Sequence, residues 1–122
     1  MLKPLFDKEC NLIGWIRLDE HIFNENMNWI AYISGGHAWS SETGNWMGPV
    51  NGLTCLDTSG RVVAWNTNSN IRGSARPARP ARAARAARPA RPARPARPAR
   101  PAKPATPAGG WSSLSIEEWS SQ

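Results

Sequence analysis

The first 66 residues repeat one pattern of apolar and small positions four times. Each copy has two apolar residues followed by a small residue, and in three copies an aromatic residue comes next. Eight or nine positions before each small residue stands a large apolar residue, and a turn-forming residue follows it at once. Because these columns coincide in four copies, they indicate an internal repeat. The small residues, at intervals of 17, 17 and 16 positions, are Gly14, Ala31, Gly48 and Ala64.

Each repeat has the composition of a β-hairpin. The turn formers Asp, Asn and Ser bond to their own backbone two residues on, and Gly44 and Gly60 can supply a positive φ late in two turns. The segments between turns are rich in Trp, Ile, Val and Tyr, which pack well on a pleated sheet. We therefore predict an all-β domain over residues 1–66, with four hairpin repeats at about 4–20, 21–36, 37–52 and 53–66.

The small column has two interpretations. Four hairpins around a pseudo-four-fold axis would bring equivalent residues close together, and close convergence excludes bulky side chains. Alternatively, each small residue lets a neighbouring ring pack over it. We prefer the first interpretation, which makes the small residues the centre of the repeat core.

Charge divides the chain into parts of opposite sign. Residues 1–66 hold four basic and seven acidic residues, a net charge of −3, whereas residues 67–108 hold eleven basic residues and no acid. From Arg76 to Ala108 the chain keeps a period of three, mostly Arg-Pro-Ala. A tract without large apolar residues cannot build a core, and its prolines favour polyproline II. We predict a connector over 67–75, a disordered tether over 76–108 and a short motif over 109–122.

The basic tract is a candidate polyanion-binding segment. In polyproline II its basic side chains would line one edge, about 9 Å apart, and guanidinium groups suit phosphate geometry. No aromatic residue is interleaved, so base stacking within the tract is not expected. A plain spacer, contact with other polyanions such as anionic lipid, and recognition by a proline-binding partner stay open. The candidate residues are Arg76, Arg79, Arg82, Arg85, Arg88, Arg91, Arg94, Arg97, Arg100 and Lys103.

The C-terminal motif is too apolar for a plain solvated terminus. Ser115 and Glu118 have the spacing of a capping box, which predicts a short helix start. A short amphipathic motif on a long tether is typical of a docking peptide, either for a protein partner or for the chain's own β-domain. The candidate docking residues are Trp111, Leu114, Ile116 and Trp119.

No set of residues with recognisable catalytic spacing is present. His21 and His37 hold equivalent places in their repeats, and with Cys55 they could form a zinc site, but the usual tight ligand spacing is missing. There is no Gly-rich phosphate loop, no Gly-x-Ser-x-Gly and no obvious carboxylate pair. We therefore expect no enzyme, no catalytic or metal site and no cofactor.

The longest uninterrupted apolar run, Trp29–Ile33, is far too short to span a bilayer. The first residues also lack the apolar stretch of a secretory signal. We therefore expect a cytoplasmic protein in a reducing compartment, and we interpret Cys10 and Cys55 as thiols.

The repeat pattern over residues 4–66 resembles the four-fold β-flower proteins, small bacterial proteins with four hairpin repeats. The stretch Asp57-Thr-Ser-Gly-Arg-Val-Val-Ala-Trp65 is most similar to their unit, whereas Pro49 and a longer turn set the third repeat apart. The similarity extends to a Pro-rich basic tail that ends in a short motif, here Trp111-Ser-Ser-Leu-Ser-Ile-Glu-Glu-Trp119. This resemblance implies a fold and no activity.

The sequence favours a non-catalytic binding or adaptor protein, in which the β-domain engages one surface and the C-terminal motif another. Tryptophans left exposed by a small core would favour homo-oligomers. The alternative function is non-specific binding of nucleic acid or another polyanion through the arginine-rich tail.

Overall fold

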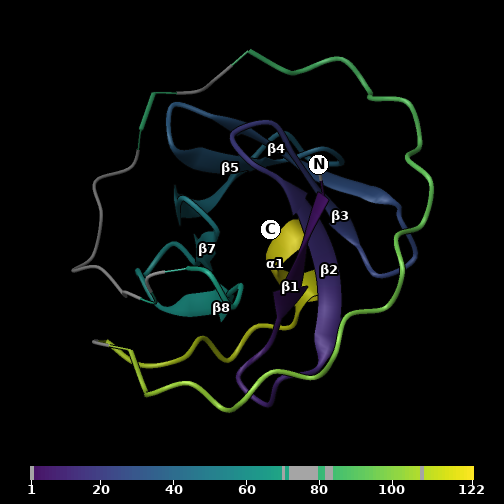
Figure 1. Ribbon diagram of the computed structural model, residues 1–122. Helices are drawn as coiled ribbons and strands as arrows, with labels where there is room; N and C mark the ends of the chain where they lie inside the picture. The colour runs from purple at the N-terminus through teal and green to yellow at the C-terminus, as the bar shows by residue number, and fades with distance from the viewer. Residues whose placement is uncertain (1, 70, 72–79, 82–83, 108) are drawn as a thin grey trace.

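The computed structural model describes residues 2–69, 71, 80–81, 84–107 and 109–122. Over these residues it contains eight strands and one short C-terminal helix (Figure 1). The elements are β1 (Leu2–Phe6), β2 (Leu12–Arg17), β3 (His21–Asn24), β4 (Trp29–Ser34), β5 (His37–Ser40), β6 (Trp46–Asn51), β7 (Thr54–Leu56), β8 (Val62–Ala64) and α1 (Ile116–Ser120).

Every strand pairs antiparallel with the next one along the chain, so the sheet follows the order β1 to β8. The two ends of the sheet meet at Phe6 and Trp65, whose backbone N–H groups each donate to the other residue's carbonyl, at 2.8 and 3.0 Å. The side chain of Asn66 adds a bond from Nδ2 to the Pro4 carbonyl at 2.6 Å. The result is a nearly closed barrel of four hairpins, which confirms the all-β prediction.

The four hairpins share one irregularity. In each hairpin the register shifts immediately before the large apolar residue that the sequence pattern marks. Such a bulge bends the strand and increases its twist, which helps a sheet of short strands to curve into a barrel. The four residues that follow the shifts are Phe6, Phe23, Trp39 and Leu56.

The turns of the hairpins are built alike. In the first turn, the Asp7 carboxylate accepts from the backbone N–H of Glu9 and of Asn11, both at 2.9 Å. Asn24 and Asp57 make the same pair of bonds in their turns, at 2.9 and 3.0 Å. In the longer third turn the Ser40 hydroxyl accepts from Glu42 and Thr43. Side chains that bond to nearby backbone therefore shape all four turns, as predicted.

A positive φ angle occurs late in each of these turns. The two predicted positions, Gly44 and Gly60, have φ angles of 75° and 85°. In the first two turns the equivalent residues are Cys10 and Met27, at 65° and 63°. An ordinary side chain rarely adopts this backbone region, so the sequence gives no sign of it there.

Two of the four small residues, Gly14 and Gly48, lie against the backbone of the next hairpin. A Cβ atom on Gly14 would overlap the carbonyl oxygen of Phe23, and one on Gly48 would overlap that of Leu56. Both of these carbonyls belong to the first strand of the next hairpin. Ala31 and Ala64 are fully buried in the barrel interior. At the two glycines the close neighbour is thus a backbone carbonyl, which neither interpretation of the sequence anticipated.

The described residues after β8 do not form the disordered tail that we predicted. In the part of the tail that the structure describes, the chain is extended without regular secondary structure and runs around the outside of the barrel (Figure 1). We call residues 80–107 the strap. The prediction of a long disordered tail is therefore wrong. The tract cannot build a core of its own, but the barrel offers its prolines a surface to follow. No helix among the described residues is long and apolar enough to cross a membrane.

Candidate functional site

The C-terminal motif forms helix α1 through the capping box that its spacing predicts. The Ser115 hydroxyl accepts from the backbone N–H of Glu118 at 3.1 Å, and the Glu118 carboxylate accepts from the backbone N–H of Ser115 at 3.1 Å. Both donors belong to the helix start and would otherwise lack a partner. A helix of five residues is unstable alone, so its packing must hold it in place.

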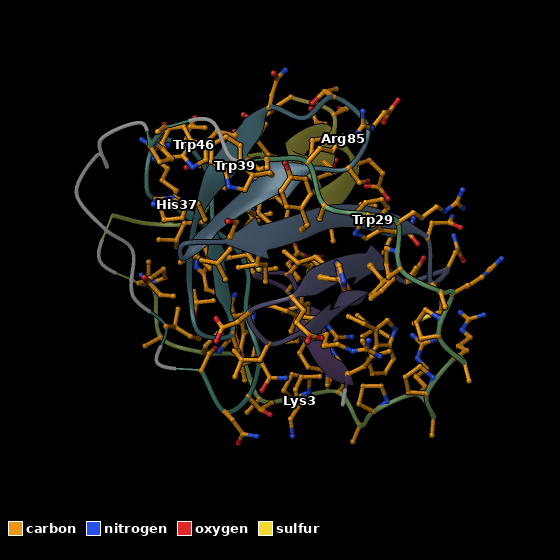
Figure 2. All side chains as sticks on the ribbon, turned by 90° about the horizontal axis from the view of Figure 1, so that it is seen from above. Lys3, Trp29, His37, Trp39, Trp46 and Arg85 are labelled. Atoms are coloured by element: carbon orange, nitrogen blue, oxygen red, sulfur yellow. The ribbon has the colours of Figure 1, made fainter. Side chains whose placement is uncertain are left out.

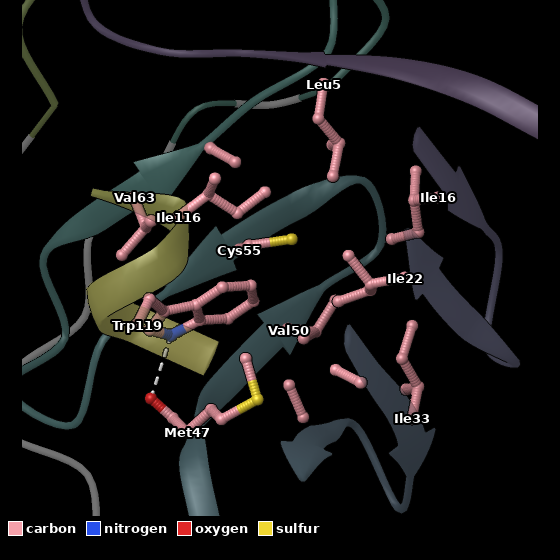
Figure 3. Close-up of a cluster of buried hydrophobic side chains, with 13 residues drawn as sticks. Leu5, Ile16, Ile22, Ile33, Met47, Val50, Cys55, Val63, Ile116 and Trp119 are labelled. Carbon is pink, nitrogen blue, oxygen red and sulfur yellow. Dashed lines mark hydrogen bonds between the residues drawn. The ribbon is translucent and has the colours of Figure 1, made fainter. Parts of the chain in front are cut away.

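That packing is provided by the barrel interior. Ile116 and Trp119 belong to the same buried cluster as interior residues such as Leu5, Ile22 and Cys55 (Figure 3). The Trp119 ring is fully buried, and its indole N–H donates to the carbonyls of Met47 at 2.9 Å and Leu56 at 3.1 Å. The helix therefore completes the core of the barrel rather than lying on its surface.

Polar contacts join the motif to the third and fourth turns. The Ser40 hydroxyl donates to the Ser120 carbonyl at 2.6 Å, and Thr43 donates to the Gln122 carbonyl at 2.8 Å. In the fourth turn, the Ser112 hydroxyl donates to the buried Asp57 carboxylate at 2.7 Å. Strand direction alternates, so the four hairpin turns lie at one end of the barrel. The helix closes that end.

The other two motif residues lie nearer the surface. Leu114 is partly buried against the interior cluster. Trp111 is half-buried against a separate outer cluster that includes Phe6 and Trp65, and it forms a parallel bridge with Val62. All four candidate docking residues thus contact the chain's own β-domain.

The exposure of the strap residues to solvent varies with a period of three. Each described proline of the repeat is half-buried or buried, and Ala86 is half-buried where the repeat lacks proline. Ala86 packs against an outer aromatic cluster of Tyr32, Trp39 and Trp46, and Figure 2 shows the strap passing over this region. This period matches the three residues per turn of polyproline II, in which every third residue lies on the same side. The exposed cations are Arg85, Arg88, Arg91, Arg94, Arg97, Arg100 and Lys103.

Three strap arginines bond to the hairpin turns. Arg91 donates to the Asn26 carbonyl at 2.9 Å, and Arg100 donates to the Glu9 carbonyl at 2.7 Å. Arg85 donates to the Ser41 carbonyl in the third turn. Glu9 and Asn26 occupy equivalent positions, two residues after the turn former, so the strap contacts a repeated feature of the barrel. The candidate residues Arg76, Arg79 and Arg82 lie outside the described residues.

The two histidines lie at the equivalent starts of β3 and β5. Burial lowers the pKa of His21, whose ring contacts Phe23 and Trp29 edge-on. The Nδ1 atom of His37 accepts from the Trp46 indole at 3.2 Å. Among the described residues, no three His, Cys, Asp or Glu side chains gather as metal ligands would.

The two cysteines are buried free thiols. Burial raises the pKa of Cys55 to about 12, so this thiol stays protonated and unreactive at neutral pH.

Together, the hairpins, the docked helix and the strap define a small all-β barrel protein that encloses its own C-terminal motif. The chain matches the 4-fold beta flower protein family over residues 3–120, and it therefore belongs to that family. The match includes the strap and helix α1 as well as the four hairpins. No curated protein and no solved structure matches the chain.

Proposed function

We propose that this protein is a non-catalytic binding protein that presents a row of arginines to polyanions, with nucleic acid as the first candidate. The observation that carries the proposal is the period of three in the strap, which holds the prolines against the barrel and leaves the basic side chains exposed. A cation every three residues in polyproline II repeats at about 9 Å. Contacts of such a row with phosphates would release counterions, which drives non-specific binding.

The charge distribution supports this proposal. The net charge of −3 over residues 1–66 is opposite in sign to that of residues 67–108, which hold eleven basic residues and no acid, and is too small to neutralise it. Arg85, Arg91 and Arg100 each bond to the barrel through uncharged carbonyls. Their positive charges therefore remain available to a polyanion.

An adaptor that engages a partner through a free C-terminal motif has less support. Trp119 is fully buried, and both Trp119 and Ile116 pack in the interior cluster. A partner would have to withdraw these side chains from the core before it could bind them. The polyanion function needs no such rearrangement.

We also propose that the four hairpins are related by a pseudo-four-fold axis. The recurrence of the bulge and of the turn bonds in every hairpin supports this symmetry. Three equivalent turns would then offer equivalent carbonyls to the strap. Arg91 and Arg100 bond to two of them, and Arg85 reaches the third, the Glu42 carbonyl, at 3.5 Å.

Fluorescence anisotropy with labelled single- and double-stranded oligonucleotides tests the polyanion function. We expect duplex binding by the full chain at 50 mM salt, weakened roughly 10³-fold at 200 mM if about six phosphates are contacted. Changing Arg88, Arg94 and Arg97 to Gln should reduce the slope of log affinity against log salt by about 2–3. Arg61→Gln, which removes one exposed cation of the barrel, is the control for loss of a charge outside the strap and should change the slope by less than about 1. Absence of binding at 50 mM salt would rule the function out.

A further inference from the structure

A cavity of about 490 Å³ lies between the strap and the first hairpin turn. Its size is within the roughly 300–1,000 Å³ of small-ligand sites. Lys8 and Glu9 line it from the turn, whereas Arg100 and Lys103 line it from the strap. Three cations and one acid give the lining an excess of positive charge. This excess favours an anionic ligand.

The cations come from segments that the fold brings together. Lys8 and Lys103 are exposed side chains. Arg100 is held in place because its guanidinium donates to the Glu9 carbonyl at 2.7 Å. A guanidinium has five N–H donors, so most of them remain for an anion. A held guanidinium with two neighbouring ammonium groups is well suited to a phosphate.

The cavity also has an aromatic wall, which the basic tract lacks in sequence. Trp111 lines it and is half-buried. The backbone at Trp111 is held by its bridge to Val62, where the Ser112 N–H donates to the Val62 carbonyl at 2.9 Å. A ring held in this way can stack on a nucleobase, a contact that tolerates any base sequence. Thr106 adds a hydroxyl to the lining.

We infer that this cavity binds one nucleotide unit of a single-stranded nucleic acid, with the phosphate among Lys8, Arg100 and Lys103 and the base on Trp111. The site deepens the polyanion binding proposed above and rests on it. A base can reach Trp111 only outside a duplex stack. The cavity therefore predicts a preference for single strands that an exposed arginine row alone would not produce.

The test compares two double variants of the full chain with the same loss of charge. Lys8→Gln with Lys103→Gln removes cations from the cavity, and Arg88→Gln with Arg94→Gln removes exposed strap cations that do not line it. Affinity for a 12-nucleotide single strand and for the matching duplex is measured by anisotropy at 50 mM salt. We expect the cavity pair to lose roughly 10-fold more single-strand affinity than the strap pair and to lose the preference for single strands.

Trp111→Leu removes the stacking surface without changing charge. It should weaken single-strand binding roughly 10-fold, leave duplex binding unchanged and leave the salt slope unchanged. Because Trp111 also packs against the barrel, the thermal unfolding of the Trp111→Leu variant is measured as well. If this variant unfolds, the double variant Lys8→Gln with Lys103→Gln still tests the site.

Equal effects of the two double variants would overturn the cavity site while leaving polyanion binding intact. If the unaltered chain binds neither oligonucleotide, both the cavity site and the function on which it rests are wrong.

Discussion

The barrel and the strap are both built from sequence repeats, but different kinds of contact fix their positions. In the barrel, each repeat unit of about 17 residues contains a turn former, a bulged apolar residue and a small residue, and these three positions have different structural roles. In the strap, a unit of three residues only alternates a buried side with an exposed side. A shift of the strap by three residues would preserve that alternation. Its register must therefore come from contacts that do not repeat.

The C-terminal end of the strap provides such an anchor. Trp111 bridges to Val62, Ser112 bonds to Asp57, and Trp119 is buried in the interior. A low-complexity tract can therefore follow a defined path when the segment that follows it makes specific contacts with the fold.

Trp119→Ala should have the largest effect. It removes a fully buried ring and the donor to two backbone carbonyls, so we expect the free energy of unfolding to fall by about 3–5 kcal/mol. This loss is measured by urea denaturation. Leu18→Ala, at a side chain that is 50% exposed, is the control and should stay within about 0.5 kcal/mol. A loss below about 1 kcal/mol in the Trp119 variant would show that the motif does not anchor the strap.

Gly48→Ala should be the next most damaging change. Its φ of 138° disfavours any side chain, and the added Cβ would overlap the Leu56 carbonyl, so we expect a loss of at least about 2 kcal/mol. Gly52→Ala is the matched control, because its φ is also positive but no atom lies within 4 Å of the new Cβ. It should cost about 1 kcal/mol. Similar losses in both variants would mean that the neighbouring hairpin does not require the small residue.

Asp57→Ala should cost more than Asp7→Ala, although both residues start equivalent turns. Asp57 is buried and its carboxylate also accepts from Ser112, whereas the carboxylate of Asp7 bonds only within its own turn. We expect about 2–3 kcal/mol for Asp57 and about 1 kcal/mol for Asp7 from urea denaturation. Equal losses would indicate that the tail adds nothing to the fourth turn.

Acid should weaken the barrel slightly through His21. Burial lowers its pKa in the folded state, while the unfolded chain keeps a value near 6.5. The unfolded chain therefore takes up the proton first, so stability is full above pH 6.5 and is lost as the pH falls through the folded pKa. The urea midpoint at pH 5.5 should lie below the midpoint at pH 7.5. This difference should be smaller in His21→Gln. An identical pH dependence in that variant would contradict the assignment.

Short-range features of the fold were predictable from the sequence. The turn formers bond to backbone only two to four residues away, so hairpin positions and the positive φ of Gly44 and Gly60 could be predicted. The capping box of helix α1 is equally local. Cys10 and Met27 were missed because they adopt a glycine-like backbone without the glycine that normally signals it.

Long-range contacts were not predictable. We expected a disordered tail because the tract cannot build a core of its own, and that reasoning left out the barrel as a surface for the prolines. The cavity next to Trp111 was missed for a related reason. Lys8 and Lys103 are far apart in sequence, and no spacing rule relates them.

The sequence by itself determined the hairpins, their turns, the period of the strap and the start of the helix. Each depends on bonds or side-chain alternation within a few residues, which act before the chain is folded. Only the tertiary structure decided that Trp119 completes the core, that the strap runs along the outside of the barrel and that Trp111 joins a cationic cavity. These placements need surfaces that exist only once the four hairpins have closed. Their energies come from burial against those surfaces rather than from local preference.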